Sequence, residues 1–514
     1  MSFESTLQNG SILPAQVPVQ LRRLFPDAEF LGSDDIRVLA ATADSRECRP
    51  GTLFAAIVGE KQDGHEFAAE AVARGASALL VERPRHELAL PQCVVPNVRR
   101  AFAELCTRLW QSPSLRLKTI GITGTNGKTT TTWLVQSILQ AAGCQTGVLG
   151  TIHYDDGIRS EKSRLTTPDS ASLSAWLARM VHNGTTHAAM EVSSHALVQD
   201  RIDGTRLDVA VVTNVTQDHF DFHHNFNCYR EAKQQIFGHL KPGGLAVVNA
   251  DDPGSMQCRQ ALSGHKQVTF GLEQTADISA RIFDESLSGT LFDLRFPGSE
   301  ISVRTPLLGR HNVSNCLAAA AAAWHLGLSP KQIGAGIAAL RAVPGRMEPV
   351  EWGQAFSVFV DYAHTDDALR RCVQGLRSLT PGRVIVVYVD GGDRDRTNRP
   401  LLTQAAAHAY LAILTSDNPR TEDPAQIIAD CLTGCVPGRS RPEVVVDREA
   451  AIRRAIDVAR PGDSVLIAGK GHETEQIIGV ERHHFDDREV VRAALTSFVP
   501  RNQFHSRQMS ASHS

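Results

Sequence analysis

The stretch Gly121-Ile-Thr-Gly-Thr-Asn-Gly-Lys-Thr-Thr130 decides the fold of the central part of the chain. An apolar, strand-like segment at residues 117–122 leads into it, and a helical pattern at residues 131–140 follows it. A strand, a glycine-rich turn and a helix start form the arrangement that holds nucleotide phosphates, because backbone N–H groups and the positive end of the helix face the anion. The stretch therefore predicts a nucleotide-binding α/β domain.

Lys128 and Thr129 carry the chemistry expected of this loop. Lys128 would add a point charge beside the phosphates, and the hydroxyl of Thr129 would bind Mg²⁺. The general pattern G-x-x-x-x-G-K-[ST] places a glycine where this chain has Ile122. A chance Gly-Lys-Thr in a surface loop is the alternative, which the flanking strand and helix disfavour. The expected nucleotide contacts are Gly124, Thr125, Asn126, Gly127, Lys128, Thr129 and Thr130.

The composition describes a globular protein of several domains. Its 514 residues suffice for about three domains, and a net charge of −3 favours neither nucleic acid nor a membrane surface as a partner. The ten cysteines lack metal-ligand spacing, which favours free thiols in a reducing cytoplasm. No signal-peptide pattern is evident, and the longest apolar run, residues 316–324, is too short to span a bilayer. We expect that run to form a buried helix.

Strands and helices alternate along the chain, which predicts an α/β fold with a mostly parallel central sheet. The expected domains are residues 1–115, 116–343 and 344–500, followed by a polar, disordered tail at 501–514. A polar segment at 111–114 is expected to be a linker. The expected strands are 36–41, 52–58, 78–81 and 93–96 in the first domain, 117–122, 146–151, 188–192, 209–214 and 245–249 in the second, and 356–361, 384–389, 411–415, 443–446 and 464–468 in the third; a helix is expected at 65–74.

Two expected strands of the central domain end in residues that can bind a metal. Met190-Glu-Val-Ser-Ser-His195 places a carboxylate at the end of one strand, and Asn214-Val-Thr-Gln-Asp-His-Phe-Asp-Phe-His223 follows another. Ligands collect at such strand ends in open α/β sheets. Glu191 and His219 are therefore candidate ligands for a second Mg²⁺ near the phosphates, although each alone could equally be a hydrogen-bonded loop residue.

Together these motifs resemble those of the Mur ligase family. They are Gly124-Thr-Asn-Gly-Lys-Thr129, Glu191-Val-Ser-Ser-His195 and Asp218-His-Phe-Asp221, with Lys233 fourteen residues beyond His219. The family's loop also lacks the glycine that Ile122 replaces. Further matches, spread from about Asp44 to Val490, are Asp44-Ser-Arg46, Thr166-Thr-Pro168, Asn249-Ala-Asp-Asp252, Gly309-Arg-His-Asn312, Asn315, Gly345-Arg346, Asp361-Tyr-Ala-His364, Gly391-Gly-Asp-Arg-Asp395, Asp417-Asn-Pro-Arg420 and Gly469-Lys-Gly-His-Glu473.

The resemblance implies a cytoplasmic, ATP- and Mg²⁺-dependent enzyme that forms amide bonds in the stem peptide of peptidoglycan. It implies an N-terminal UDP-binding domain, a central ATPase domain with the phosphate loop, and a C-terminal Rossmann-like domain that binds the amino acid. A monomer is expected, without nucleic acid or membrane insertion. The acceptor would be UDP-MurNAc-L-Ala-D-Glu, whose carboxylate attacks ATP to give an acyl phosphate that the amino acid's amine then captures.

Within the family the chain most resembles the ligases that add the third residue of the peptide, with meso-diaminopimelate as the amino acid. Asp417-Asn-Pro-Arg420 is the motif variant associated with it. Arg420 can clamp the distal carboxylate, which lysine lacks, with two parallel hydrogen bonds. The residues implied around this amino acid are Arg394, Asp417, Asn418, Pro419, Arg420, Gly469 and Glu473.

The resemblance also implies that Lys233 carries a carbamate formed from CO₂, which would hold Mg²⁺ together with Glu191 and His219. Carbamylation needs a neutral amine, so its surroundings would have to depress the lysine's pKa; the local sequence alone suggests an ordinary solvated helix lysine. The residues implied at the UDP-MurNAc-dipeptide are Ser45, Thr166, Thr167, Ser193, Gln199 and Arg201, and those implied near the nucleotide are Asn312, Arg346 and Asp361.

Two alternatives remain beside this interpretation. One is a related ligase with another amino acid or acceptor, such as a lysine-adding or folylpolyglutamate-type enzyme; Arg420 argues against lysine, and Asp44-Ser-Arg46 argues against folate. The other is a non-catalytic nucleotide-binding homologue, against which the intact Lys128, Glu191, His219 and Lys233 argue. Departures at Thr52, Glu60-Lys61, Asp366 and Asn398 leave room for a paralogue of the diaminopimelate ligase.

Overall fold

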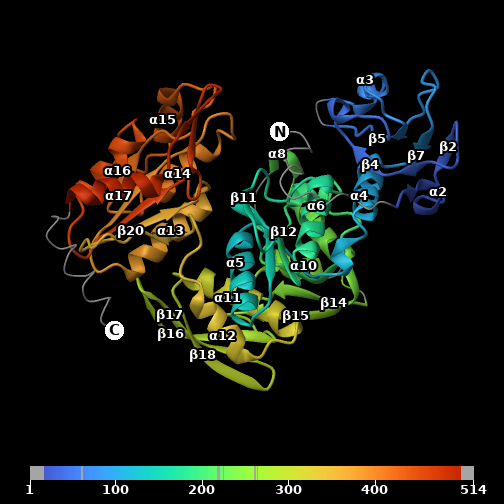
Figure 1. Cartoon of the computed structure of the whole chain (residues 1–514). Helices are drawn as coiled ribbons and strands as arrows, with labels where there is room; N and C mark the ends of the chain where they lie inside the picture. Colours follow the sequence, from blue (N-terminus) through green and yellow to red (C-terminus); the bar gives the residue numbers. More distant parts are fainter. Residues whose placement is uncertain are drawn as a thin grey trace. The chain divides into compact units, whose positions relative to one another are not determined.

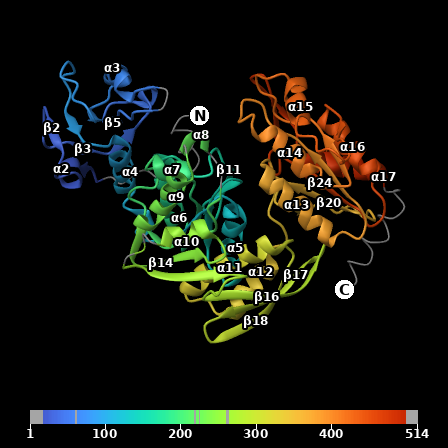
Figure 2. The same cartoon turned by 180° about the vertical axis from the view of Figure 1, so that it is seen from behind.

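The computed structural model describes residues 17–59, 62–216, 220–223, 225–259, 262 and 264–498. Residue contacts divide the chain into two compact units, one of residues 1–281, 293–302 and 314–339 and the other of the remaining residues. Figures 1 and 2 show the chain from opposite sides. The tail at 501–514, expected to be disordered, lies outside the described residues. The domain borders at 115 and 343 stay predictions.

The N-terminal part is a small sheet with helices on both faces. Its strand order is β2-β7-β6-β5-β4; β4 to β7 run parallel and β2 antiparallel at the edge. Helices α2 and α4 pack on one face and α3 on the other. The elements are β1 (Val19–Gln20), α2 (Leu21–Leu24), β2 (Glu29–Leu31), β3 (Arg37–Val38), β4 (Ala40–Thr42), η1 (Ser45–Glu47), β5 (Thr52–Ala55), η2 (Gly64–Phe67), α3 (Ala68–Ala73), β6 (Ala78–Val81), β7 (Gln92–Val94), α4 (Val98–Leu109) and η3 (Pro113–Leu115).

The central sheet has the order β11-β10-β9-β12-β8-β13-β14-β15-β16-β17-β18. In this order, every neighbouring pair between β9 and β16 is parallel, as expected. At the edge next to β9, β10 pairs antiparallel with both β9 and β11. Its elements are β8 (Lys118–Thr123), α5 (Lys128–Ala141), β9 (Thr146–Leu149), β10 (His153–Asp155), β11 (Ser160–Lys162), α6 (Ser170–His182), β12 (His187–Glu191), α7 (Ser194–Val198), β13 (Leu207–Val212), α8 (Phe220–His223), α9 (Phe226–Gln234), η4 (Gln235–His239), β14 (Leu240–Asn249), α10 (Pro253–Cys258), β15 (Lys266–Gly271), β16 (Ile278–Ser286), β17 (Gly289–Phe296), β18 (Ser299–Thr305), α11 (Arg310–His325) and α12 (Pro330–Ala339).

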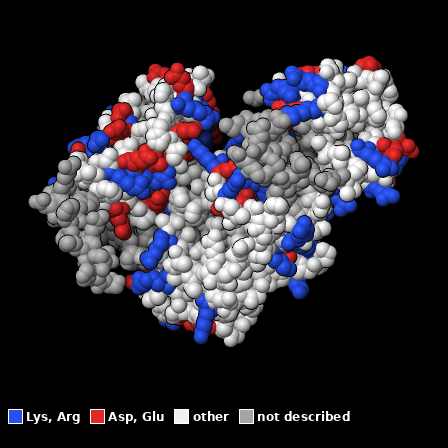
Figure 3. All heavy atoms as spheres, viewed as in Figure 1, with Lys and Arg blue, Asp and Glu red and all other residues white. Residues whose placement is uncertain are grey.

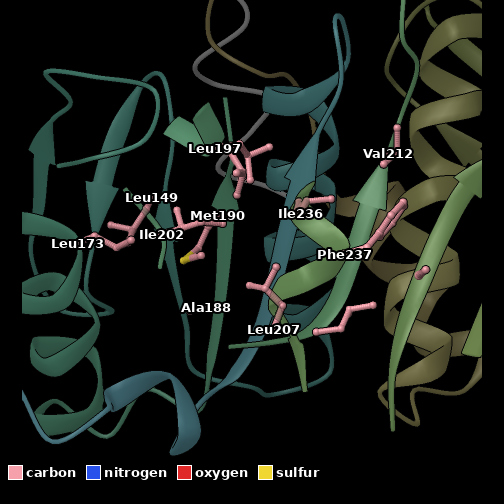
Figure 4. Close-up of a cluster of buried hydrophobic side chains, with 14 of the residues drawn as sticks. Leu149, Leu173, Ala188, Met190, Leu197, Ile202, Leu207, Val212, Ile236 and Phe237 are labelled. Atoms are coloured by element: carbon pink, nitrogen blue, oxygen red, sulfur yellow. The ribbon is translucent and has the colours of Figure 1, made fainter. Parts of the chain in front are cut away.

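The core of this sheet follows from the period of two in its strands. Alternate residues such as Ala188 and Met190 of β12 face a cluster contributed by α6, α7, α9, η4 and α10, part of which Figure 4 shows. The other face is covered by α5, against which α12 packs so closely that a Cβ on Gly336 would lie 2.3 Å from the Cα of Ile138. The alanine-rich run at 316–324 lies in the buried helix α11, as expected.

The C-terminal sheet has the order β19-β20-β24-β21-β22-β23, and its strands pair parallel except β19. One set of alternate strand residues packs against α13, α14 and α15, and the other set packs against α16 and α17. This is the doubly covered α/β domain that the alternating pattern predicts. Its elements are β19 (Glu348–Pro349), β20 (Ser357–Asp361), α13 (Asp366–Leu379), β21 (Val384–Tyr388), α14 (Asn398–Ala406), β22 (Leu411–Leu414), α15 (Pro424–Leu432), β23 (Glu443–Val444), α16 (Arg448–Asp457), β24 (Ser464–Ala468), β25 (Glu475–Ile478), β26 (Glu481–His484) and α17 (Asp487–Phe498).

Two expectations about local structure are wrong. The strand expected at 36–41 is split into β3 and β4 around the exposed Leu39. The polar segment 111–114 is not a free linker, because Pro113 begins a 3₁₀ turn and Ser114 is fully buried. The hydroxyl of Ser114 accepts a hydrogen bond from the backbone of Arg206 at 3.1 Å, which explains a buried serine in a connecting segment.

The distribution of charged side chains on the surface agrees with the small net charge of −3. On the face shown in Figure 3, acidic and basic side chains lie next to one another rather than in separate fields. The ten cysteines are free thiols, as expected. No helix in the described part of the chain is long and apolar enough to cross a membrane.

Candidate functional site

The phosphate loop joins β8 to α5 through two glycines with positive φ. Gly124 has φ 155° and Gly127 has φ 85°. A Cβ at position 124 would lie 1.9 Å from Thr213 Oγ1, and one at position 127 would lie 2.4 Å from Asn315 Oδ1. The loop conformation and the close approach of Thr213, which follows β13, and of Asn315 in α11 therefore both require glycine at these positions.

The structure explains why position 122 is not glycine. Ile122 is a fully buried residue of β8, paired in register with Glu191 of β12 and Val211 of β13. A branched apolar side chain is favoured in such a strand. The turn therefore begins at Gly124, and position 122 belongs to the sheet core.

The end of β13 fixes the shape of the loop. The backbone N–H of Thr125 donates to Asn214 O, and that of Asn126 donates to Asn214 Oδ1, both at 2.9 Å. Lys128 Nζ donates to the carbonyls of Gly124 and Thr125 at 2.8 and 2.9 Å. Asn214 was not assigned a role from the sequence, although its place at a strand end was visible.

Glu191 lies at the end of β12 and is 1% exposed. Its Oε2 accepts hydrogen bonds from the hydroxyls of Thr129 and Thr151 at 2.9 Å each, and its Oε1 accepts one from the backbone of Thr151 at 2.8 Å. A buried carboxylate beside the loop's threonine hydroxyl is an oxygen-rich pair of the kind that Mg²⁺ prefers. The predicted proximity of Glu191 and the phosphate loop is thus present in the structure.

Lys233 differs from the solvated helix lysine that its local sequence suggests. It is 1% exposed, and its Nζ donates to Gly124 O at 2.8 Å. The same nitrogen lies 4.4 Å from the ring centroid of Tyr229, whose hydroxyl donates to Thr125 Oγ1 at 3.2 Å. Helix α9 thus brings Lys233 directly onto the phosphate loop.

The remaining predicted metal ligand, His219, lies outside the described residues. His223, four positions later, is buried in α8, and its Nε2 lies 2.9 Å from Ser194 Oγ. Among the described residues, no group of three or more His, Cys, Asp and Glu side chains could hold a metal ion.

Five of the residues expected at the dipeptide form one cluster beyond Glu191. Thr167 Oγ1 donates to Glu191 O at 2.9 Å and accepts from the backbone of Ser193 at 3.0 Å. Arg201 donates to Thr167 O at 3.1 Å and to the side chain of Gln199 at 3.0 Å. Thr166 Oγ1 accepts from the hydroxyl of Thr151 at 3.2 Å.

Ser45 lies apart from this cluster along the chain, in the N-terminal part. It is 6% exposed, and its hydroxyl donates to Glu70 Oε2 at 2.9 Å. Asp44 caps the same 3₁₀ turn by accepting from the backbone of Arg46 at 2.9 Å. The motif Asp44-Ser-Arg46 therefore forms an ordered turn.

In the second compact unit, the three residues expected near the nucleotide are also ordered. Asn312 Nδ2 donates to Leu308 O at 2.8 Å. Asp361, at the end of β20, accepts from the backbones of Met347 and Ala363 at 2.6 and 2.7 Å. The Arg346 guanidinium lies 4.7 Å from the ring centroid of Tyr362, within the range of a cation–π contact.

Six of the seven residues expected around the amino acid line one small pocket of the C-terminal domain, and Pro419 does not line it. Asn418 Nδ2 donates to Glu473 Oε2 at 3.2 Å, and Arg420 Nη1 donates to Gly392 O at 2.5 Å. Burial raises the pKa of Glu473, and the nearby Asp417 carboxylate adds to that rise. The pocket is lined by Tyr362, His364, Val389, Asp390, Gly391, Arg394, Asp417, Asn418, Arg420, Gly469 and Glu473.

Sequence reasoning assigned no role to Asp390, which lines this pocket, or to Lys470, which bonds to one of its lining residues. Asp390, at the end of β21, is 6% exposed, and burial raises its pKa to about 6. Lys470 is fully buried, and its Nζ donates to Asp417 Oδ1 at 2.8 Å. The available signal was their position, since Asp390 directly precedes the motif Gly391-Gly-Asp-Arg-Asp395 and Lys470 lies within Gly469-Lys-Gly-His-Glu473.

The comparisons with known proteins agree with this geometry. Family models match the Mur ligase middle domain at residues 122–323, the Mur ligase glutamate ligase domain at 345–471, and the Mur ligase family catalytic domain at 39–108. A UDP-N-acetylmuramoyl-L-alanyl-D-glutamate–2,6-diaminopimelate ligase of Geobacillus kaustophilus is 45% identical over 471 residues, which are 90% of this chain and 96% of that protein. The chain belongs to the Mur ligase family.

Two further relatives support the same placement. A UDP-N-acetylmuramoyl-L-alanyl-D-glutamate–2,6-diaminopimelate ligase of Solibacter usitatus is 46% identical over 92% of this chain and 96% of its own length. A solved structure titled as a UDP-N-acetylmuramoyl-L-alanyl-D-glutamate–2,6-diaminopimelate ligase is 35% identical, with a TM-score of 0.69 and coverage of 94% of this chain and 99% of that one. The chain therefore has the three-domain α/β fold of the Mur ligases.

Proposed function

We propose that this Mur ligase joins meso-diaminopimelate to UDP-MurNAc-L-Ala-D-Glu, with conversion of ATP to ADP and phosphate. The observation that carries the proposal is the pocket in which Arg420 and Arg394 lie with Asn418 and Glu473. Arginines suit the carboxylates of the amino acid, and a carboxylate such as Glu473 suits an ammonium group. The similarity to proteins named as diaminopimelate ligases supports the same substrate.

The phosphate loop supplies the ATP end of the reaction. The N-terminus of α5 favours an anion, and Lys128 brings a positive charge to the same loop. These groups would stabilise the charge that develops as the D-glutamyl carboxylate attacks the γ-phosphate to give an acyl phosphate. The amine of diaminopimelate would then attack the acyl carbon, which forms the amide and releases phosphate.

The donor set of the loop fits Mg²⁺. We propose that the hydroxyl of Thr129 would hold one Mg²⁺, and that Glu191, His219 and a carbamate on Lys233 would hold a second one near the phosphates. When bound, Mg²⁺ would neutralise charge on the phosphate oxygens. Carbamylation would convert the buried Lys233 ammonium, now bonded to a carbonyl, into a carboxylate that can bind a cation.

The cluster beyond Glu191 would receive the muramoyl dipeptide. Arg201 is the cation of this cluster and would face the peptide's carboxylates, while Thr167 and Ser193 offer hydroxyl groups. We assign the UDP end to the N-terminal turn that contains Ser45. The proposal places this activity in the cytoplasm, since ATP and a UDP-linked precursor are its substrates. It also includes action as a monomer.

Phosphate release tests the function directly. The full-length protein is incubated with ATP, Mg²⁺ and UDP-MurNAc-L-Ala-D-Glu, and release is measured with meso-diaminopimelate, with L-lysine and with neither. We expect stimulation by diaminopimelate at least about a hundredfold above lysine, because an unpaired arginine in the pocket penalises lysine. Stimulation by lysine alone would favour the lysine-adding alternative, and stimulation by neither would contradict the proposal.

The carbamate is tested separately. Intact-protein mass spectrometry at neutral pH should detect one bound CO₂ that is lost on acidification and is absent from a Lys233→Arg variant. Thorough removal of CO₂ and bicarbonate should lower the rate, and added bicarbonate should restore it. An enzyme that keeps its full rate without CO₂, or a fully active Lys233→Ala variant, would contradict the assignment.

A further inference from the structure

Arg420 has a backbone conformation that its own side chain disfavours. Its φ is 52°, in the left-handed region that residues with a Cβ rarely adopt. Its guanidinium reaches Gly392 O, and a Cβ on Gly391 would lie 3.0 Å from Nη1, so the arginine fits closely into the pocket wall. Some other part of the domain must hold this conformation in place.

The hairpin of β25 and β26 holds Arg420 on both sides of its Cα. The backbone N–H of Arg420 donates to Ile477 O at 3.2 Å, and that of Gly479 donates to Arg420 O at 2.8 Å. The backbone N–H of Ile477 donates to Asn418 Oδ1 at 2.8 Å. The first strand of the hairpin thus forms a parallel β-bridge with the motif Asp417-Asn-Pro-Arg420, between Ile478 and Arg420.

Two side chains secure the other end of the motif. Gln476 Nε2 donates to Asp417 O at 2.7 Å. Lys470 Nζ donates to Asp417 Oδ1 at 2.8 Å and to Glu475 O at 2.6 Å, so one fully buried ammonium links the motif to the start of the hairpin. The same nitrogen lies 3.6 Å from Glu473 Oε2.

We propose that Gln476 and Lys470 are positioning residues for amino-acid specificity, which act by holding Asp417-Asn-Pro-Arg420 so that Arg420 meets the distal carboxylate of the substrate. The inference rests on the proposed function and extends it to residues outside the recognised substrate contacts. Two parallel hydrogen bonds to a carboxylate need a fixed arginine, whereas recognition of an amino acid without that carboxylate does not. Loss of either side chain should therefore weaken use of diaminopimelate selectively.

The test is steady-state kinetics of full-length Gln476→Ala, Gln476→Glu and Lys470→Met. For Gln476→Ala we expect a KM for diaminopimelate raised about five- to tenfold, with the KM values for ATP and UDP-MurNAc-L-Ala-D-Glu within about twofold of wild type. Gln476→Glu keeps the size but replaces the donor by an acceptor, so it should act in the same direction. Lys470→Met leaves the Asp417 carboxylate without its ammonium partner, and its effect should be larger.

The matched control is Arg482→Ala in β26 of the same hairpin. Arg482 is exposed and pairs with Glu475 Oε2 at 2.8 Å, so its loss should leave every KM unchanged. The ratio of kcat/KM for diaminopimelate to that for lysine should fall in the Gln476 variants and not in Arg482→Ala. A folded Gln476→Ala or Gln476→Glu variant with an unchanged KM for diaminopimelate, or with equal changes for all three substrates, would overturn the inference.

These outcomes separate the two proposals. A wild-type protein that responds to neither amino acid contradicts the proposed function. A wild-type protein that uses diaminopimelate, with Gln476 variants that use it equally well, contradicts the positioning role alone. Melting temperatures measured beside the kinetics identify variants whose loss of activity is loss of fold.

Discussion

The hydroxyl of Thr129 donates to the carboxylate of Glu191 at 2.9 Å, and this bond joins the first turn of α5 to the end of β12. The two residues are 62 positions apart in the chain. Parallel pairing of β8 with β12 brings them together, because the phosphate loop leaves the sheet at the same edge where β12 ends.

Replacing Glu191 by glutamine should abolish most of the activity. The variant keeps the hydrogen-bond acceptor for Thr129 but removes the charge that a cation needs, so we expect kcat to fall at least about a hundredfold. Phosphate release as a function of Mg²⁺ concentration measures this. Glu161→Gln, an exposed carboxylate on β11 of the same sheet, is the control. Retention of wild-type Mg²⁺ dependence in Glu191→Gln would refute the role of Glu191.

The two glycines Gly124 and Gly143 offer a second test. Both have positive φ, 155° and 82°, but an added Cβ meets Thr213 Oγ1 at 1.9 Å at the first position and nothing within 4 Å at the second. Gly143→Ala should lose only about 1 kcal/mol of stability from backbone strain and keep its KM for ATP. Gly124→Ala should in addition displace the loop and lose ATP binding.

Nucleotide binding by isothermal titration calorimetry and urea unfolding separate these effects. An alanine at position 124 that leaves the Kd for ATP unchanged would show that the loop tolerates the displacement. The comparison is informative because both positions have positive φ, whereas only position 124 adds a steric contact, with Thr213.

The sequence predicted the phosphate loop well because its chemistry is local. The glycines, Lys128 and Thr129 are contiguous, and their flanking strand and helix have clear periodicity. Ile122 also became interpretable once its strand was known, since it pairs within the sheet and is buried. Loops whose parts are adjacent in sequence can be recognised without knowing the tertiary fold.

Contacts that depend on tertiary packing could not be predicted in the same way. Lys233 lies on a polar helix, and only the packing of α9 against the loop shows that its ammonium is buried on Gly124 O. Likewise, nothing near Gln476 indicates that it bonds to Asp417, because the two residues are 59 positions apart and meet through strand pairing. The sequence thus predicted the motifs proposed to face the ligands but not the groups that hold these motifs in place.

Helix α16 carries a buried and an exposed arginine, and their contributions to the stability of the protein should differ strongly. Arg448 is bonded by two nitrogens to Asp487, with both side chains fully buried, whereas Arg453 pairs with Glu449 at the surface. Arg448→Met should destabilise the protein by about 3–5 kcal/mol, because it leaves the Asp487 carboxylate buried without its partner. Arg453→Met should cost about 0.5 kcal/mol or less. Equal midpoints of urea unfolding for the two variants would contradict this assignment.

Asp390 should make the stability of the C-terminal domain depend on pH. Burial raises its pKa to about 6 from an ordinary value of 3.8, so the protonated form is favoured in the folded state. The stability that this group contributes is fully present below pH 3.8 and is lost as the pH rises through about 6. The loss is on the order of 3 kcal/mol, since the pKa rises by about two units and one unit corresponds to about 1.4 kcal/mol.

Asp390→Asn removes this titration while it keeps an oxygen for the backbone of Gly391, which donates to Asp390 Oδ1 at 2.9 Å. Relative to wild type, the variant should therefore gain stability between pH 4 and pH 8, measured as the difference between the two proteins' free energies of unfolding in urea at each pH. Asp367→Asn removes an exposed carboxylate paired with Arg371. Its free energy of unfolding should be close to that of wild type at both pH 4 and pH 8. A wild-type-minus-variant difference that is constant from pH 4 to pH 8 would show that Asp390 does not titrate in this window.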